Sequence, residues 1–171
     1  MARSHSPVIG VIGGSGVYEI EGLGNVHWKK AVSPFGEPSG DLCFGTLGDV
    51  QFVFLPRHDR GHRIPPSDIN YPANIDVLKR AGVTDIISVS AVGSLNADLA
   101  PGTFVIIDQF IDRSFARRKS FFGPGLVGHV SMAHPVCARL GSHIEEAAHE
   151  AGIPHHPGGT YLVMEGPQFS S

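Results

Sequence analysis

The residues of this chain that are best suited to chemistry are donors of hydrogen bonds and of positive charge. A glycine-rich turn, Gly13-Gly14-Ser15-Gly16, follows an apolar run, and Ser15 is its only side-chain donor. With so little side-chain bulk, backbone N–H groups can approach a ligand closely, which suits an anion such as phosphate. The alternative is a tight turn between a strand and a helix that binds nothing.

This turn does not match the well-known glycine-rich motifs. A dinucleotide fingerprint that starts at Gly14 would need glycine where Glu19 stands. A P-loop needs a lysine directly after its glycines, and the first lysine of the chain is Lys29. A hydrolase nucleophile elbow would need glycine in place of Val17.

A second cluster, residues 57–63, holds five side chains out of seven that can carry positive charge. In an anion site, Arg57 would supply a planar pair of donors and His58 a second donor. His58 and His62 are four residues apart, a spacing that joins metal ligands only on a helix. Gly61 and the prolines that follow disfavour a helix, and the arginines would repel a cation, so we predict no metal site. A solvated basic loop is the other alternative.

The elements that position these residues include several short apolar runs bounded by glycine or proline, which predict strands. They lie at residues 8–12, 42–47, 50–55, 86–92, 104–107 and 161–164, and the more polar segment 27–32 is also expected to be a strand. Gly48-Asp49 predicts a hairpin between residues 42–47 and 50–55. Residues 104–107 are expected to form a buried strand, and residues 114–128 to form a long loop.

Two helices are expected between these strands. The first opens at Asn70-Tyr71-Pro72 and ends at Gly82, with Ile75, Leu78 and Ala81 on one face. The second ends at Gly152, and its apolar positions are Val136, Leu140, Ile144, Ala147 and Ala151. The order of strands and helices predicts an α/β fold with a mixed, largely parallel central sheet flanked by helices.

Ligands of such sheets bind at the carboxyl ends of parallel strands. Residues 13–16 and 90–94 both follow apolar strands and consist mainly of small side chains. We expect them to meet at one edge of the sheet, which favours the phosphate interpretation of the glycine turn. His129 follows the long loop, where a plain surface histidine is the alternative to a site residue.

Length and charge limit the classes of protein further. The 171 residues predict a single domain over residues 1–171, and the net charge of −3 gives no case for nucleic acid. The first apolar run is too short for a signal peptide or a membrane span. Cys43 and Cys137 make no disulfide framework, which favours a cytoplasmic protein. Because a proline turn and no helix follows residues 161–164, we expect a domain truncated at its carboxyl end.

Six motifs resemble, in the same order, those of S-methyl-5'-thioadenosine phosphorylases, which belong with the trimeric purine nucleoside phosphorylases. They are Ile12-Gly13-Gly14-Ser15-Gly16, Pro56-Arg57-His58, Asn70-Tyr71-Pro72-Ala73-Asn74, Ser90-Ala91-Val92-Gly93-Ser94-Leu95, Asp108-Gln109-Phe110-Ile111-Asp112-Arg113 and Glu165-Gly166-Pro167-Gln168-Phe169-Ser170. The resemblance spans nearly the whole chain.

The resemblance implies phosphorolysis, in which phosphate attacks the anomeric carbon of S-methyl-5'-thioadenosine and releases adenine and 5-methylthioribose 1-phosphate. The positions that match the family's phosphate-holding residues are Ser15, Arg57, His58, Ser90 and the backbone N–H of Ala91. Ser15 stands where many members carry threonine, and the hydroxyl is kept. The positions that resemble substrate contacts are His62 and, from a neighbouring subunit, His129 near the 5' substituent, with Phe169 and Ser170 beside base and ribose.

The resemblance also implies a homotrimer, and no cofactor apart from inorganic phosphate as co-substrate. The family's aspartates that recognise and protonate the purine would follow Ser171, so no catalytic acid of this chain is assigned by match. Whether the 171-residue chain is active therefore stays open. The alternatives are a methylthioinosine- or inosine-type purine nucleoside phosphorylase and a non-catalytic nucleoside- or phosphate-binding fragment.

Overall fold

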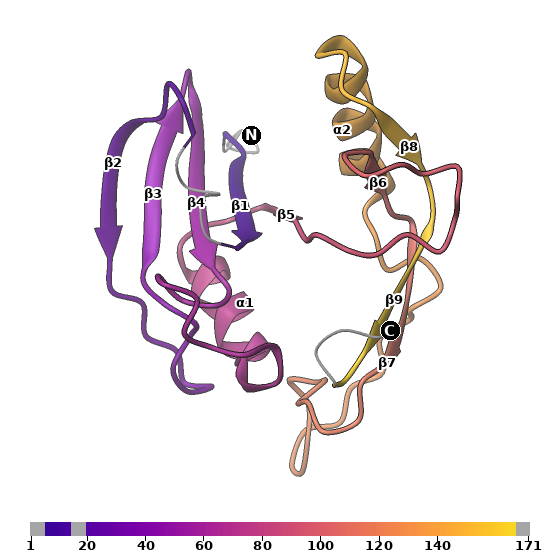
Figure 1. The fold of residues 1–171 in the computed structure, drawn as a ribbon. Coiled ribbons are helices and arrows are strands. Elements are labelled where there is room, and N and C mark those ends of the chain that lie inside the picture. The colour runs from indigo at the N-terminus through magenta and orange to yellow at the C-terminus, as the bar shows by residue number, and fades with distance from the viewer. Residues whose placement is uncertain (1–5, 15–19, 167–171) are drawn as a thin grey trace, which may run out of the picture. The chain divides into compact units, whose positions relative to one another are not determined.

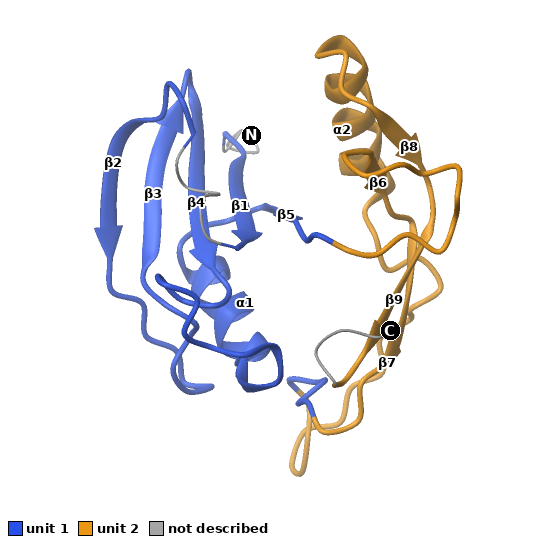
Figure 2. Ribbon diagram, viewed as in Figure 1, with its two compact units in different colours: residues 1–91, 117–121 blue, residues 92–116, 122–171 orange. Residues whose placement is uncertain are grey.

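The computed structural model describes residues 6–14 and 20–166. It divides into two compact units, coloured separately in Figure 2. Unit 1 comprises residues 1–91 and 117–121, and unit 2 comprises residues 92–116 and 122–171. The single domain expected from the sequence remains a prediction.

Unit 1 is built on a sheet whose described strands follow the order β2-β3-β4-β1-β5 (Figure 1). The strands are β1 (Val8–Gly13), β2 (Gly24–Lys29), β3 (Leu42–Leu47), β4 (Val50–Pro56) and β5 (Asp85–Ser88). β1 pairs parallel with β4 and with β5, whereas β3 pairs antiparallel with β2 and with β4. This confirms the predicted mixed sheet and the hairpin at Gly48-Asp49.

Parallel pairing aligns the carboxyl ends of β4, β1 and β5. Gly13 lies opposite Pro56, and Ile12 lies opposite Ser88. Backbone hydrogen bonds continue beyond the strands, from Arg57 N to Gly13 O (3.0 Å) and from Val89 N to Ile12 O (2.9 Å). The segments that follow the three strands therefore leave the sheet at one edge, as the sequence predicted.

Two strands of unit 1 differ from the sequence prediction in extent. β2 begins at Gly24 and ends at Lys29, and its register against β3 shifts between Gly24 and His27, where Asn25 has a φ of 53°. β5 ends at Ser88, four residues before the end of its apolar run. Apolar residues continue after Ser88, so hydropathy alone could not predict the residue at which β5 stops pairing with β1.

Helix α1 (Tyr71–Arg80) has the ends that the sequence predicted. The Asn70 side chain caps it by accepting a hydrogen bond from Ala73 N, and Pro72 lies in the first turn, where a missing N–H costs nothing. Gly82 follows the helix with a φ of 88°, a left-handed conformation that suits glycine.

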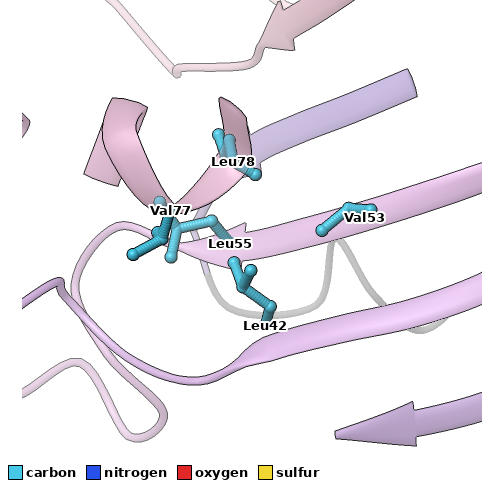
Figure 3. Packing of buried hydrophobic residues seen from close by; sticks show 5 residues of the cluster. All are labelled: Leu42, Val53, Leu55, Val77 and Leu78. Carbon is cyan, nitrogen blue, oxygen red and sulfur yellow. The ribbon is translucent and has the colours of Figure 1, made fainter. Parts of the chain in front are cut away.

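Unit 1 has one buried cluster between α1 and the sheet and a second one, made of Val11, Cys43 and Phe54, that includes no residue of α1. Figure 3 shows the first cluster, which consists of Leu42, Val53, Leu55, Val77 and Leu78. The predicted apolar face of α1 is wrong at Ile75, which is 36% exposed. The helix instead buries Ala73, Asn74, Val77 and Leu78. The polar Asn74 lies on the inner face, so the buried stripe is displaced from the one that apolar residues alone suggest.

Unit 2 contains helix α2 and two pairs of parallel strands among the described residues. The elements are β6 (Phe104–Ile106), β7 (Gln109–Arg113), α2 (Ala138–Glu150), β8 (His155–Pro157) and β9 (Thr160–Met164). β6 pairs with β8, and β7 pairs with β9. α2 is followed by Gly152, whose φ is 64°, as the sequence predicted.

The predicted burial of residues 104–107 is wrong for β6, since Phe104 is 56% exposed. Within the described residues, β6 pairs with β8 alone and does not enter the sheet of unit 1. Strand β8 was not predicted, because its sequence, His155-His156-Pro157, contains no apolar run. In the described part of the chain, no helix has both the length and the apolar character needed to cross a membrane.

Candidate functional site

Arg57 is the charged side chain at the shared edge of β4, β1 and β5. Its Nε donates to Nε2 of His58 at 3.1 Å, and its Nη1 donates to the carbonyl oxygen of Val89 at 2.6 Å. Arg57 follows β4 and Val89 follows β5, so one guanidinium connects the ends of two strands. These two bonds use two of the five N–H groups of an arginine.

His58 is buried beside it, with 8% of its surface exposed. Its Nδ1 lies 2.8 Å from the carbonyl oxygen of Ile64. A carbonyl can only accept a hydrogen bond and a guanidinium can only donate one, so Nδ1 carries the proton and Nε2 is an acceptor. The partners therefore define His58 as the neutral Nδ1–H tautomer.

The loop after His58 is tightly folded and not helical, as the sequence predicted. The backbone N–H groups of Arg63 and Ile64 both donate to the carbonyl oxygen of His58, at 2.9 and 3.1 Å. Asp59 and His62 have positive φ values of 62° and 57°. The His62 ring stacks on the His58 ring with 4.4 Å between centroids. The two histidines thus lie together through ring stacking in a loop. The helix on which their four-residue spacing would make them metal ligands is not formed.

The basic side chains of residues 57–63 have different interaction partners. Arg63 forms an ion pair with Asp59, and the guanidinium carbon of Arg60 lies 4.7 Å from the centroid of the Trp28 ring. Within residues 6–14 and 20–166, no group of three His, Cys, Asp or Glu side chains could hold a metal ion. Of the three arginines, Arg57 is the one whose contacts place it at the ends of the parallel strands.

The structure brings some of the sequence-predicted residues together. Ser90 and Ala91 are exposed and directly follow Val89, whose carbonyl binds Arg57, so this segment and Arg57 lie at the same edge. His62 is exposed above His58. His129 belongs to unit 2, where it is exposed in the loop that precedes α2. Ser15, Phe169 and Ser170 lie outside the described residues.

Sequence reasoning missed two hydrogen-bonding groups of unit 1, the first at this edge and the second on α1. The first is the carbonyl of Val89, for which a sequence carries no signal because every residue has a carbonyl. The second is Asn74, which is 3% exposed and binds Ser39 twice. Ser39 N donates to Asn74 Oδ1 at 2.7 Å, and Asn74 Nδ2 donates to Ser39 Oγ at 2.8 Å. The spacing of Asn70 and Asn74 on one helix was the available signal.

These residues make an edge suited to holding an oxyanion. Two hydrogen bonds hold the Arg57 guanidinium at the strand ends, and the exposed Ser90 and Ala91 supply a hydroxyl and backbone N–H groups in the adjoining segment. Donors of these kinds stabilise negative charge. The fold and this edge define the chain as an α/β protein with a candidate oxyanion site at the carboxyl ends of parallel strands. The family profile described as the Phosphorylase superfamily matches residues 8–171. The chain therefore belongs to the phosphorylase superfamily.

Several curated relatives of this chain are named S-methyl-5'-thioadenosine phosphorylase. S-methyl-5'-thioadenosine phosphorylase of Rhodospirillum rubrum is 66% identical over 165 residues, which are 96% of this chain and 56% of that protein. The protein of the same name from Hyperthermus butylicus is 52% identical over 163 residues, 95% of this chain and 60% of the relative. The chain thus spans a little over half the length of these relatives.

Solved structures agree with the sequence comparisons. A methylthioadenosine phosphorylase from an antarctic soil metagenomic library has a TM-score of 0.93 and 46% identity, covering 97% of this chain and 59% of that one. A mutant adenosine/methylthioadenosine phosphorylase from Schistosoma mansoni, in complex with methylthioadenosine, has a TM-score of 0.90 and 36% identity. The match covers 97% of this chain and 66% of the mutant. These similarities confirm the predicted fold class.

Proposed function

We propose that the protein catalyses phosphorolysis of S-methyl-5'-thioadenosine to adenine and 5-methylthioribose 1-phosphate. The observation that carries the proposal is the Arg57 guanidinium, held by His58 and Val89 at the edge where the parallel strands end. The names of the relatives point to the nucleoside, and the donors at this edge suit its co-substrate, inorganic phosphate.

In the proposed reaction, a phosphate oxygen forms a bond to the anomeric carbon of the ribose while the bond from that carbon to the purine nitrogen breaks. The electron pair of the broken bond goes to the purine, which takes up a proton. The phosphate would be held close to the sugar, with its charge balanced, by Ser15, Arg57, His58, Ser90 and the N–H of Ala91. No residue of the 171-residue chain is assigned to the proton transfer.

The remaining contacts belong to the same proposal. His62 and, from a neighbouring subunit, His129 would lie near the 5' substituent, and Phe169 and Ser170 beside the base and ribose. The proposal includes a homotrimer, a cytoplasmic location and no cofactor beyond phosphate as co-substrate. A preference for methylthioinosine or inosine is the alternative within the same chemistry.

A second function, binding without turnover, is favoured by one observation. The chain covers 56% of the Rhodospirillum rubrum relative, so much of that protein has no counterpart in these 171 residues. Such a chain would bind phosphate or nucleoside and release no purine.

Base release measured with and without inorganic phosphate separates these functions. The purified 171-residue chain should be supplied in turn with S-methyl-5'-thioadenosine, methylthioinosine and inosine. Phosphate-dependent release of adenine supports the proposal, and release of hypoxanthine alone supports the inosine-type alternative. Calorimetric binding of phosphate without release of either base supports the second function. If the chain neither binds phosphate nor releases a base, both functions are contradicted.

A further inference from the structure

A short basic segment of the chain belongs to unit 1, although the residues on both sides of it belong to unit 2. This basic segment, residues 117–121, consists of two arginines, a lysine, a serine and a phenylalanine. It has the colour of unit 1 in Figure 2, whereas residues 92–116 and 122–171 have the colour of unit 2. Its contacts within unit 1 explain this assignment.

Two aromatic rings of unit 1 receive the basic segment. The guanidinium carbon of Arg117 lies 5.9 Å from the centroid of the Tyr71 ring, and Arg117 Nη1 donates to the Tyr71 hydroxyl at 3.3 Å. The guanidinium carbon of Arg118 lies 5.5 Å from the centroid of the Phe35 ring. Phe121 meets that same ring edge-on, with 5.0 Å between the two centroids. Both kinds of ring contact are attractive, so they favour the same docked position.

The first turn of α1 fixes both rings, which we call the aromatic platform. Tyr71 is the first residue of α1, and its hydroxyl donates to the carbonyl oxygen of Pro66 at 3.0 Å. Asn70 Nδ2 donates to the carbonyl oxygen of Phe35 at 3.0 Å, while Asn70 Oδ1 caps the helix at Ala73. None of these bonds involves the basic segment, so the aromatic platform stays ordered when that segment leaves it.

The chain is held on both sides of the basic segment. Before it, the N–H of Ala116 donates to both carboxylate oxygens of Glu165, each at 3.0 Å. After it, Gly123 and Leu126 exchange two backbone hydrogen bonds of 3.1 Å. These fixed points confine any release of the segment to the few residues between Ala116 and Gly123.

The docked segment is held at the surface. None of residues 117–121 is buried, and the Phe121 side chain is 44% exposed. Cation–π contacts at exposed sites are weak, and a segment with few buried contacts opens locally while the surrounding structure stays folded. The basic segment therefore has the features of a small element that opens and closes by itself.

We infer that residues 117–121 form a reversible latch, which closes on the aromatic platform of Phe35 and Tyr71 and opens while unit 1 stays folded. Opening uncovers the Phe35 ring and releases two guanidinium groups from their rings. This inference is independent of the proposed function, because none of these residues is assigned to phosphate or nucleoside.

Trypsin measures the opening, because it cleaves after the arginines and the lysine of the basic segment. Cleavage of a locally opened segment follows the population of the open form. Phe35→Leu removes the ring that Arg118 and Phe121 share, so cleavage of the 171-residue chain after residues 117–119 should become about tenfold faster. In the control Phe104→Leu, which changes an exposed phenylalanine of unit 2, the rate should stay within about twofold of wild type. Equal rates in wild type and Phe35→Leu would overturn the inference.

A second cleavage site separates opening of the latch from unfolding of unit 1. The bond between Arg57 and the buried His58 is protected in the folded unit, so its cleavage reports unfolding. Cleavage there should be unchanged in Phe35→Leu, which supports a latch that opens alone. If Phe35→Leu accelerates both cleavages equally, the exposed Phe121→Ala decides. Unchanged cleavage after residues 117–119 in Phe121→Ala overturns the inference.

A double-mutant cycle tests whether Phe35 and Phe121 act through their contact. Phe121→Ala alone should accelerate cleavage after residues 117–119 about fivefold, because the edge-on ring contact is lost. In the Phe35→Leu background that contact is already absent, so Phe121→Ala should change the rate by less than about twofold. If the two accelerations multiply instead, the two rings act independently and the basic segment does not close on Phe35.

Discussion

Arg57 and Val89 lie 32 residues apart in the chain and are joined by a hydrogen bond of 2.6 Å from Nη1 to the carbonyl oxygen. The residue after β4 is thereby connected to the residue after β5, across the end of β1. The bond places a guanidinium next to the segment that contains Ser90 and Ala91. The candidate oxyanion site depends on this relationship more than on the number of basic residues near it.

Replacing Arg57 with alanine should weaken phosphate binding at least tenfold, because a planar charged donor is lost. It should also lower the free energy of unfolding by about 1 kcal/mol, because the hydrogen bond to Val89 is lost. Calorimetry with phosphate and urea unfolding measure the two effects. Arg80→Ala is the matched control, since Arg80 is an exposed arginine that binds Asp76 on α1. Equal phosphate affinity in Arg57→Ala and Arg80→Ala would remove Arg57 from the site.

Truncation of the buried face of α1 should be far more costly than truncation of its exposed face. Leu78 is 0% exposed in the core cluster, so Leu78→Ala should lower the free energy of unfolding by about 3 kcal/mol. Ile75→Ala on the same helix should cost less than about 1 kcal/mol. Urea unfolding of both variants measures the difference, and equal costs would mean that α1 packs with a different face.

Asn74 should stabilise the loop of residues 33–40 through its two hydrogen bonds to Ser39. Asn74→Ala leaves the buried Ser39 N–H and hydroxyl without these partners, which should cost about 2 kcal/mol. Asn96→Ala is the control, because Asn96 lies in an exposed turn and its Oδ1 accepts one bond, from Asp98 N. A cost within about 0.5 kcal/mol for both variants in urea unfolding would contradict the role of Asn74.

Cys43 should make the folded chain less stable in alkali. Burial raises the pKa of its thiol above the ordinary value of 9.0, and the charge of Arg60 opposes this in part. Above pH 9.0 the unfolded chain loses this proton before the folded chain does, so stability falls as the pH rises toward the folded pKa. Below that range the thiol is protonated in both states, and it contributes no slope.

The measurement compares the free energy of unfolding from pH 8 to about 10.5 in a Cys137→Ala background, where Cys43 is the remaining cysteine. Cys43→Ala in that background should show a shallower decline with pH, whatever its absolute stability. Identical slopes with and without Cys43 would contradict the raised pKa.

Local signals in the sequence predicted much of unit 1. The apolar run of β1, the Gly48-Asp49 hairpin, the Asn70 cap and the Gly82 stop all depend on neighbours within a few residues, and each is confirmed. The failures involve partners distant in sequence. Among the described residues, β6 pairs with β8 and lies outside the sheet of unit 1, and α1 packs with its Asn74 side inward, which leaves Ile75 exposed.

The site shows the same division between local and distant information. Residue types identified Arg57 and His58 as candidates, because guanidinium and imidazole groups are donors that suit an oxyanion, and the family resemblance added Ser90. Residue type alone gave no reason why Arg57, and not Arg60 or Arg63, should lie at the strand ends. Arg60 and Arg63 have the same charge, and they are directed to Trp28 and Asp59.

The sequence by itself determined the α/β class, the ends of α1 and the hairpin at Gly48-Asp49, since these follow from backbone preferences and the period of apolar residues. Only the tertiary structure decided that Arg57 binds the Val89 carbonyl and that His58 accepts from Arg57. The physical reason is that a hydrogen bond depends on the position and direction of two groups. Parallel pairing of β4 and β5 with β1 sets the positions at this edge, and residue order alone does not specify them.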